Sequence, residues 1–444
     1  MKNIILFITI LVSQVALSQQ VIITPEKKEK IKTYVNHFEE NNQLMGTISI
    51  MQNGKEVINK TFGEINKKES NLLSERKYTI GSITKLFTAV LYAKLLEAGK
   101  ISFEDKLNVY FPNIPNSDKI QIKHMLNHTS GLKNYVSKSD SLHFWLKKPR
   151  TEKEILDEII MQGVSFQPRD SLSYSNSAYY LLGKILEKKY KKPFEQILTN
   201  EITTPLNLTN TVALSEGSSH NNVAKSYEKK NGKWVEMEEF YFPNAYSAGY
   251  IATTASDMNK FLNALFNYKI IKKETLQSML PKENDWFGLG IMKAPFYEYI
   301  GYGHGGDTYG THSVAAYTLE NKLAVTYIIN GENYPTNDFA IGLLSIVYDK
   351  EYALPNFKEY TPDKKFYEAY SGTYGSDKLP IKIKIYAEDS VLKAEGEGQP
   401  AFTLNPVEKH IFGFKKAGIE LEFDPYKEKM LLKQAGQEFE MTKE

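Results

Sequence analysis

The segment from Ser82 to about Ala98 constrains the fold of this chain more than any other stretch. Its apolar residues cover nearly every side of the predicted helix: Leu86, Phe87, Ala89, Val90, Leu91, Ala93, Leu95 and Leu96. A helix that is apolar all round is buried, and Gly99 follows it as the expected C-cap. We therefore expect a core built around this helix, which gives rigid support to whatever stands at its first turn.

Ser82 stands at the entrance of this helix and Lys85 lies one turn later. Residues three apart share a helix face, so an amine can lie beside a hydroxyl, and a helix N-terminus favours negative charge. These are the parts of an activated serine nucleophile. The spacing alone is weak evidence, because Ser-x-x-Lys occurs five times. Only Ser82 opens a long helix; the other matches are Ser74/Lys77, Ser130/Lys133, Ser226/Lys229 and Ser390/Lys393.

Composition limits the function classes. The 444 residues are 41% hydrophobic and 24% charged, which is typical of a soluble globular protein with room for one large and one smaller domain. The net charge of +2 argues against a nucleic-acid partner. There is no cysteine, so disulfides and thiol chemistry are excluded. His124 and His128 have the spacing of two zinc ligands, but a third ligand is not evident. We expect neither a metal nor a cofactor.

The first 18 residues have the pattern of a signal peptide. Lys2 precedes an apolar run from Ile4 to Leu17, and Ala16-Leu17-Ser18 is a small-x-small cleavage site. The run is short for a membrane-spanning helix, although an uncleaved anchor stays open as an alternative. The prediction is a bacterial protein exported to the periplasm or secreted, with no transmembrane span after cleavage.

The pattern along the rest of the chain predicts an α/β (α+β) fold. A helix over 25–42 and a hairpin over 45–62 precede the apolar helix, and residues from about 100 to 245 form a helical subdomain without strands. Further strands follow Ser247. One central antiparallel sheet, with strands from distant segments and flanking helices, accounts for this order.

A second domain is expected at the C-terminus. Residues 353–365, with two prolines, form a candidate linker after a main domain of residues 19–352. In residues 366–444, Ile381, Ile383 and Ile385 alternate with lysines, which is typical of a small all-β domain.

Two short motifs follow Ser82 in the chain. The first is Tyr174-Ser175-Asn176, just before a predicted helix. Residues two apart in extended backbone point the same way, so the phenol and the amide could face one cleft. The second is His304-Gly305-Gly306, expected between two strands, where glycines let the backbone approach a ligand and the next N–H can donate to an oxyanion.

Together these motifs resemble the penicillin-recognising serine hydrolases of the class C β-lactamase and D-Ala-D-Ala carboxypeptidase type, with related esterases and D-aminopeptidases. The resemblance covers about residues 25–350, and it implies a β-lactamase/transpeptidase-like fold. The C-terminal segment is similar to the lipocalin-like domain of such proteins. Three further stretches match the family's habits: residues 122–132, 205–211 and 247–257.

The resemblance implies the following roles. Ser82 is the acylated nucleophile, Lys85 takes its proton, and Tyr174 relays the proton to the leaving group. Asn176, His304, Gly305 and Gly306 bind the substrate. The backbone N–H groups of Ser82 and Asp307 form the oxyanion hole.

The sequence departs from the family at Gly305, where many relatives carry a hydroxyl that helps to grip a substrate carboxylate. The leading expectation is therefore an exported hydrolase of an ester, amide or D-amino-acid peptide, including a peptidoglycan fragment. A β-lactam-hydrolysing or β-lactam-binding protein is one alternative, and a catalytically weak scaffold is another. The Gly-x-Ser-x-Gly elbow of other serine hydrolases does not occur.

Overall fold

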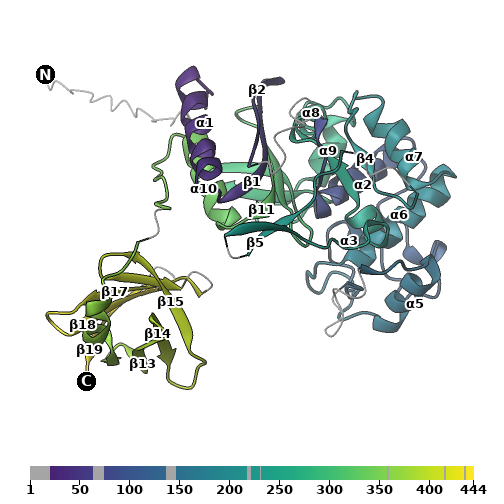
Figure 1. Ribbon diagram of the computed structural model, residues 1–444. Coiled ribbons are helices and arrows are strands. Elements are labelled where there is room, and N and C mark those ends of the chain that lie inside the picture. Colours follow the sequence, from purple (N-terminus) through teal and green to yellow (C-terminus); the bar gives the residue numbers. More distant parts are fainter. Residues whose placement is uncertain are drawn as a thin grey trace, which may run out of the picture. The chain divides into compact units, whose positions relative to one another are not determined.

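The structure is a computed structural model. It describes residues 21–444 except 64–74, 137–146, 218–221, 231, 358–359, 415–416 and 435–436. The predicted signal peptide, residues 1–18, lies outside the described residues. The chain forms two compact units, the first ending at Leu354 and the second spanning Pro355–Glu444, and each is described by itself (Figure 1).

The first unit is organised around a sheet with the strand order β2-β1-β11-β10-β9-β8. All neighbours along this path pair antiparallel. The pairing of Ile48 with Tyr327 joins segments from opposite ends of the unit, so the expected sheet from distant segments is confirmed. The strands are β1 (Leu44–Gln52), β2 (Lys55–Phe62), β8 (Met292–Phe296), β9 (Tyr299–Asp307), β10 (His312–Thr318) and β11 (Leu323–Glu332).

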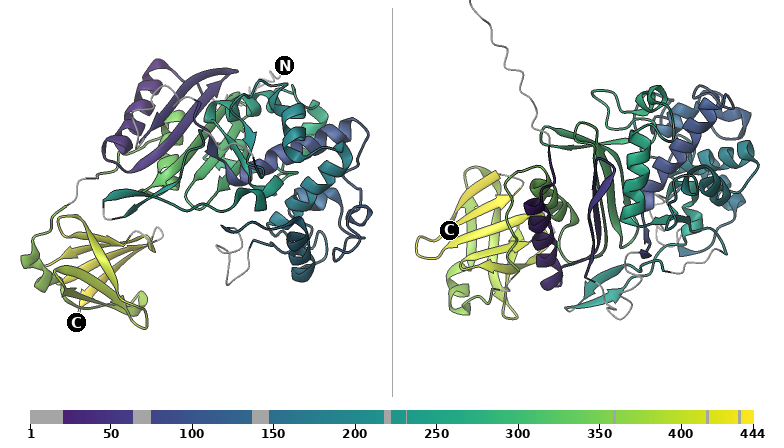
Figure 2. Two further views of the ribbon diagram at one scale, coloured as in Figure 1. Left: turned by 45° about the vertical axis from the view of Figure 1, so that its right-hand side comes forward. Right: turned by 90° about the horizontal axis from the view of Figure 1, so that it is seen from above.

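Helices cover both faces of this sheet, as the two views in Figure 2 show. On one face α1 (Pro25–Glu40) packs against α10 (Thr336–Val347), and the hydroxyl of Tyr34 donates to the carbonyl of Phe339 at 3.1 Å. On the other face α8 (Ala255–Phe266) packs against β1, β10 and β11. Because both faces are covered, every residue of β1 is buried, including the polar Thr47 and Ser49 that alternate with Ile48 and Ile50.

Beyond α8 lies a mainly helical region built around α2 (Thr84–Glu97). Eleven of the fourteen residues of α2 are buried, and Phe87 stacks on Phe261 of α8 at 4.1 Å between ring centroids. The prediction of a buried central helix is confirmed. The surrounding helices are α3 (Ile122–Leu126), α5 (Glu152–Gln162), α6 (Asn176–Tyr190), α7 (Phe194–Leu198) and α9 (Lys273–Met279).

The expectation that residues 100–245 contain no strand was wrong. A hairpin of β5 (Tyr227–Lys230) and β6 (Lys233–Glu236) joins the main sheet by parallel pairing with the end of β11. A second, three-stranded sheet has the order β3 (Tyr78–Thr79), β7 (Ile251–Thr253) and β4 (Val212–Ala213). The hairpin is rich in lysine and glutamate, and none of its strand residues is fully buried. Its sequence therefore shows no apolar face, and only its pairing with a distant strand identifies it.

The second unit is a closed barrel of eight strands, which confirms the expected small all-β domain. Its order follows the chain: β12 (Gly372–Ser376), β13 (Leu379–Glu388), β14 (Val391–Gly396), β15 (Phe402–Glu408), β16 (Ile411–Phe414), β17 (Ile419–Asp424), β18 (Lys429–Gln434) and β19 (Gln437–Lys443). Tyr370 of the short helix α11 (Tyr367–Tyr370) stacks on Phe423 in the barrel core. An apolar cavity of about 460 Å³ is lined in part by Ile381, Phe402 and Phe414.

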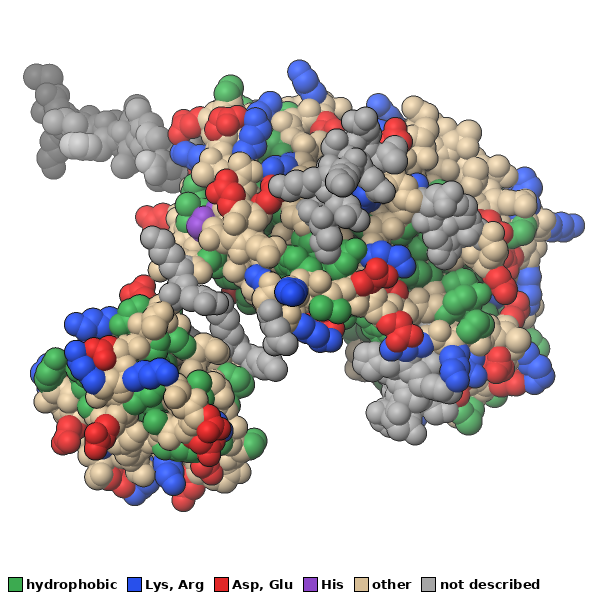
Figure 3. All heavy atoms as spheres, viewed as in Figure 1, with side chains coloured by type: hydrophobic (Ala, Val, Ile, Leu, Met, Phe, Trp, Pro, Cys, Tyr) green, Lys and Arg blue, Asp and Glu red, His purple; other side chains and the backbone are tan. Residues whose placement is uncertain are grey.

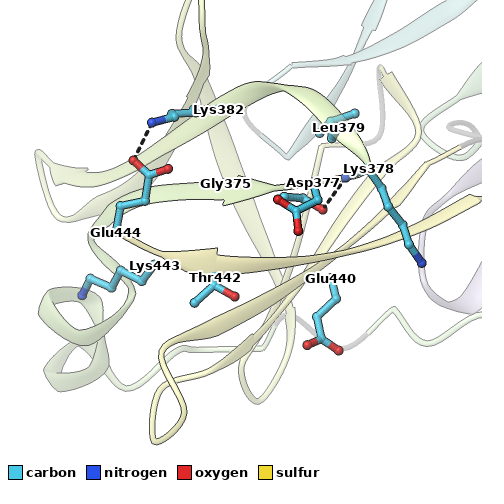
Figure 4. Close-up of a pocket in the computed structure, with 10 residues that line it drawn as sticks. Gly375, Asp377, Lys378, Leu379, Lys382, Glu440, Thr442, Lys443 and Glu444 are labelled. Carbon is cyan, nitrogen blue, oxygen red and sulfur yellow. Dashed lines mark hydrogen bonds and ion pairs between the residues drawn. The ribbon is translucent and has the colours of Figure 1, made fainter.

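The barrel also carries a larger and more polar hollow of about 670 Å³ beside β12, β13 and β19. Figure 4 shows its lining, where Lys382 forms an ion pair with Glu444 at 2.7 Å. Lysine and acidic side chains alternate around it, so no single charge dominates this hollow.

No single charge dominates the face of the molecule drawn in Figure 3. On the face drawn in Figure 3, lysine and arginine side chains are interspersed with aspartate and glutamate. None of the helices formed by the described residues has the length and apolar character needed to cross a bilayer.

Candidate active site

Ser82 lies on a tight turn between β3 and α2. Residues Gly81–Ile83 form a 3-10 turn, and α2 begins at Thr84. Gly81 has a φ of +46°, and a Cβ there would lie 2.5 Å from the carbonyl oxygen of Asp307. Only glycine allows both this backbone conformation and this approach. The turn therefore holds Ser82 directly beside the end of β9.

The Lys85 side chain is fully buried beside Ser82. Its Nζ lies 3.0 Å from Ser82 Oγ and donates to Asn176 Oδ1 and to the carbonyl of Ala248, both at 2.7 Å. These partners are all uncharged. Burial holds the pKa of the Lys85 amine well below its usual range, so the site favours the neutral amine.

Tyr174 approaches Ser82 from another direction. Its hydroxyl donates to Ser82 Oγ at 2.7 Å, and its ring lies 4.3 Å from the ring of His128. The Nδ1 atom of His128 accepts the backbone N–H of Ser175 at 3.2 Å, which fixes the segment that carries the tyrosine. Burial raises the pKa of Tyr174 above its usual value, so the phenol keeps its proton.

Asn176 is the first residue of α6, and Ser175 caps that helix by accepting from the N–H of Ala178. While Asn176 Oδ1 accepts from Lys85, its backbone N–H and its Nδ2 donate to Asn134 Oδ1 at 3.2 and 3.1 Å. The orientation of the amide is thus determined from both sides. The structure therefore brings Ser82, Lys85, Tyr174 and Asn176 into one hydrogen-bonded cluster.

His304-Gly305-Gly306 was expected between two strands, and this was wrong. All three residues lie inside β9, where His304 pairs with Ala315 of β10. A Cβ on Gly306 would lie 2.0 Å from the carbonyl of Ile80 and 2.9 Å from the backbone nitrogen of Ser82. At Gly305 the nearest atom would be 3.8 Å away. The missing side chain at Gly306 is what lets β9 approach the Ser82 turn.

The His304 side chain is buried within the site, at 4% exposure. Its Nδ1 lies 2.5 Å from the carbonyl of Gly305, and its buried Nε2 has no hydrogen-bond partner among the described atoms. Burial lowers the pKa of His304 to about 4. At neutral pH this histidine is uncharged, so it cannot supply a cation for a substrate carboxylate.

Asp307 ends β9, and its backbone lies against the Gly81 turn while its side chain is exposed. That carboxylate contacts His312 Nδ1 at 2.7 Å, and the other ring nitrogen of His312 lies 3.1 Å from Glu332. The two carboxylates raise the pKa of His312 to about 10. The charged imidazole joins the ends of β9 and β11, so it helps to hold Asp307 in place.

A cavity of about 260 Å³ opens beside Ser82. Its described lining is mostly uncharged and comes from the α2 entrance, the α6 entrance, the end of β9 and the loops before β7. The lining residues are Gly81, Ser82, Tyr135, Val136, Asn176, Phe240, Ala245, Ala248, Gly249, Asp307, Thr308 and Tyr309. Tyr174 and His304 are not among them.

Three residues support the site although the sequence predicted no role for them. The carbonyl of Ala248 accepts from Lys85, Asn134 orients Asn176, and His128 supports the Tyr174 segment. Ala248 and His128 lie in stretches that match the family, but a backbone acceptor or a supporting ring has no motif of its own. Asn134 lies just outside such a stretch.

The side chains of His124 and His128 each accept a hydrogen bond from a backbone N–H group. His124 Nδ1 accepts the N–H of Gln121 in the α3 cap, as His128 Nδ1 does for Ser175. Within the described residues no group of three or more His, Cys, Asp or Glu side chains is placed to hold a metal ion.

This chain is similar in sequence to two penicillin-binding proteins of Bacillus subtilis. Penicillin-binding protein 4* of Bacillus subtilis (strain 168) is 24% identical over 430 residues, covering 89% of this chain and 94% of its own. The putative penicillin-binding protein PbpX of the same organism is 28% identical over 285 residues, covering 63% and 68%.

Solved structures show the same fold. The D-amino acid amidase of Ochrobactrum anthropi SV3, complexed with D-phenylalanine, has a TM-score of 0.66 at 23% identity and covers 73% of this chain and 100% of its own. The octameric penicillin-binding protein homologue from Pyrococcus abyssi has a TM-score of 0.66 at 24% identity, covering 93% and 99%.

The family model described as Beta-lactamase matches residues 32–344, which is more than half of the chain. The match includes the Ser82 turn, the α6 entrance and the end of β9. The chain therefore belongs to the Beta-lactamase family of serine hydrolases.

Proposed function

We propose that this protein is an exported serine hydrolase that forms an acyl-enzyme on Ser82 and acts on an ester, an amide or a D-amino-acid peptide. One observation carries the proposal. Ser82 Oγ lies between two proton-transfer groups, Lys85 Nζ at 3.0 Å and the Tyr174 hydroxyl at 2.7 Å. A hydroxyl held between a base and an acid is prepared for nucleophilic attack.

Lys85 serves as the base in its neutral form. A neutral amine has two N–H groups, and the two 2.7 Å contacts to Asn176 and Ala248 use both of them. The lone pair then faces Ser82 Oγ and accepts its proton as the oxygen attacks the substrate carbonyl. The lowered pKa of Lys85 keeps this form available near neutral pH.

Tyr174 serves as the acid. Its pKa is raised by burial, so its proton is present when the tetrahedral intermediate collapses and is passed to the leaving group. In the second half of the reaction, water attacks the Ser82 ester and gives a proton to the Tyr174 oxygen, while the Lys85 ammonium returns its proton to Ser82 Oγ. The close approach of Gly306 to the Ser82 nitrogen supports an oxyanion hole made by the backbone N–H groups of Ser82 and Asp307.

The substrate class follows from what the site offers. A neutral His304 and a glycine at position 305 give a substrate carboxylate little to bind. This favours esters, amides and aminoacyl substrates over the carboxylate-bearing β-lactams and D-Ala-D-Ala peptides. The structural neighbour solved with D-phenylalanine is a D-amino acid amidase, which is consistent with this preference.

The experiment is active-site labelling followed by a substrate panel. A fluorescent fluorophosphonate should label the wild type and fail to label Ser82→Ala. Ser390→Ala is the matched control, because Ser390 begins the exposed Ser-x-x-Lys match in the barrel. Equal labelling of wild type and Ser82→Ala would refute the nucleophile. Turnover of D-aminoacyl amides and p-nitrophenyl esters should exceed that of nitrocefin; fast nitrocefin hydrolysis would instead support a β-lactamase.

A further inference from the structure

We propose that the 260 Å³ cavity beside Ser82 receives the acyl part of the substrate and selects an apolar acyl group that carries no carboxylate. This inference rests on the proposed function, since it assumes that Ser82 is the nucleophile. The inference goes further by stating which side of the scissile bond lies in the cavity and which acyl groups the cavity accepts.

The position of Tyr174 determines which side of the bond the cavity serves. The leaving group must take its proton from the Tyr174 hydroxyl, which contacts Ser82 from beside His128 and Phe287. The described lining of the cavity includes Ser82 and Asn176 but not Tyr174. The cavity therefore lies away from the leaving-group side, and the acyl group occupies it.

The walls determine what the acyl group can be. Tyr135, Val136, Phe240 and Tyr309 form much of the lining, with the Phe240 and Tyr309 rings in an edge contact at 5.5 Å between centroids. The hydroxyl of Tyr135 already donates to the carbonyl of Asn244 at 2.5 Å, so this residue mainly offers its ring. An apolar group entering here is removed from water against apolar surface.

The charge at the cavity disfavours an anionic acyl group. Asp307 is the one ionisable carboxylate in the described lining, no lysine, arginine or histidine accompanies it there, and its contact with His312 already occupies that cation. A carboxylate on the acyl group would lose its hydration without gaining a cationic partner. The volume exceeds the ~150 Å³ that suffices for benzene, so one aromatic or branched aliphatic side chain fits.

A half-buried carboxylate beside the cavity lining helps to keep the shape of the cavity. Glu239 Oε1 accepts from Ser226 Oγ and, at 3.3 Å, from Thr308 Oγ1. Thr308 in turn accepts the N–H of Thr311 at 3.1 Å. These contacts fix the segment after β9 that carries Tyr309, so the cavity is preorganised for one shape of acyl group.

The test compares three esters on the full-length protein. Two share the p-nitrophenol leaving group: the pentanoyl ester and the hemisuccinate, which differ by a carboxylate on the acyl side. The third, a pentanoyl ester of 5-hydroxy-2-nitrobenzoate, carries its carboxylate on the leaving group. The wild type should cleave the pentanoyl p-nitrophenyl ester with a kcat/KM at least about tenfold above that of the hemisuccinate.

Variants at Val136, a half-buried residue of the cavity lining, test whether the discrimination against a carboxylated acyl group arises in this cavity. The selectivity is the kcat/KM for the hemisuccinate divided by the kcat/KM for the pentanoyl p-nitrophenyl ester. Val136→Lys should have a selectivity at least about tenfold higher than that of Val136→Leu. The kcat/KM for the ester with the carboxylated leaving group should be the same in both variants. Fluorophosphonate labelling confirms that both variants have an intact Ser82. Equal use of both p-nitrophenyl esters by the wild type, or no response to Val136→Lys, would refute the inference.

The outcomes separate this inference from the proposed function. If Val136→Lys improves only the ester with the charged leaving group, the cavity binds the leaving group and the inference is wrong, while Ser82 remains the nucleophile. If Ser82→Ala cleaves all three esters as fast as the wild type, the proposed function itself fails.

Discussion

The two units of this chain bury different kinds of side chain. The first unit encloses Lys85, His124, His128 and His304 along with many hydroxyls and amides. In the described part of the barrel, every fully buried side chain is apolar or a tyrosine. Buried polar groups are costly unless they are hydrogen-bonded, and the buried amine of Lys85 meets this condition beside Ser82.

The same contrast separates two copies of one motif. Ser82 and Lys85 lie on adjoining helical turns, and their side chains meet in a buried pocket. Ser390, by contrast, is exposed on the turn between β13 and β14 with a φ of +65°, and Lys393 forms an ion pair with Glu388. Identical spacing yields a candidate catalytic pair only where the backbone is helical and buried.

The largest expected effect comes from replacing the lysine of each motif, Lys85 or Lys393, by methionine. Lys85→Met keeps the length of the side chain but removes the base, so the rate of Ser82 acylation should fall by about 10²- to 10⁴-fold. Lys393→Met should leave that rate unchanged. Stopped-flow acylation with a p-nitrophenyl ester measures both. An acylation rate within threefold of wild type in Lys85→Met would remove Lys85 from the mechanism.

The next largest effect is the difference in kcat between alanine variants of two adjacent glycines of β9. Gly306→Ala places a Cβ 2.0 Å from the carbonyl of Ile80 and pushes the strand away from the Ser82 nitrogen. A displaced oxyanion donor should lower kcat by about 10²- to 10³-fold. Gly305→Ala meets its nearest atom at 3.8 Å and should lose far less activity. If the two variants were equally impaired, the close approach at Gly306 would not be the reason.

A moderate effect is expected on the pH dependence of stability. Folding lowers the pKa of His304 from 6.5 to about 4. As the pH falls through this range the unfolded state binds a proton before the native state does, so the free energy of unfolding decreases. The loss from His304 amounts to at most about 3 kcal/mol below pH 4.

The His304→Gln variant should lack this part of the pH dependence. All three tryptophans lie in the first unit, so tryptophan fluorescence during urea unfolding reports on that unit alone. The measurement is the decrease in the free energy of unfolding from pH 6.5 to pH 4 in both proteins. An identical decrease in variant and wild type would show that His304 does not titrate as a buried group.

The smallest effect on catalysis should come from the barrel core. Leu392→Ala removes a side chain with no exposure and should lower the barrel's free energy of unfolding by about 2–5 kcal/mol. The neighbouring Val391 is 36% exposed, so Val391→Ala is the control. Hydrogen–deuterium exchange of the barrel strands, read by mass spectrometry, follows the barrel, and labelling follows Ser82. Slower acylation in Leu392→Ala than in Val391→Ala would show that the barrel contributes to catalysis.

Much of the fold could be predicted because its signals are local. The buried helix, the hairpin turn at Asn53-Gly54 and the alternation at Ile381 to Ile385 each depend on neighbouring residues. The β5–β6 hairpin could not be predicted, because its exposed Lys-rich strands form through pairing with β11. His304-Gly305-Gly306 was expected between two strands, but the structure places it inside β9, where the missing side chain of Gly306 allows close packing against the Ser82 turn.

The sequence by itself determined the nature and order of the candidate site: a serine three residues before a lysine, then a tyrosine with an asparagine, then a histidine with two glycines. These depend on residue type and spacing, which the chain states directly. Only the tertiary structure decided that Lys85 contacts Ser82, Asn176 and the Ala248 carbonyl at once, that His304 is buried and uncharged, and that a mostly uncharged cavity opens beside Ser82. The reason is that desolvation depends on every segment packed around a group, and those segments come from all parts of the first unit.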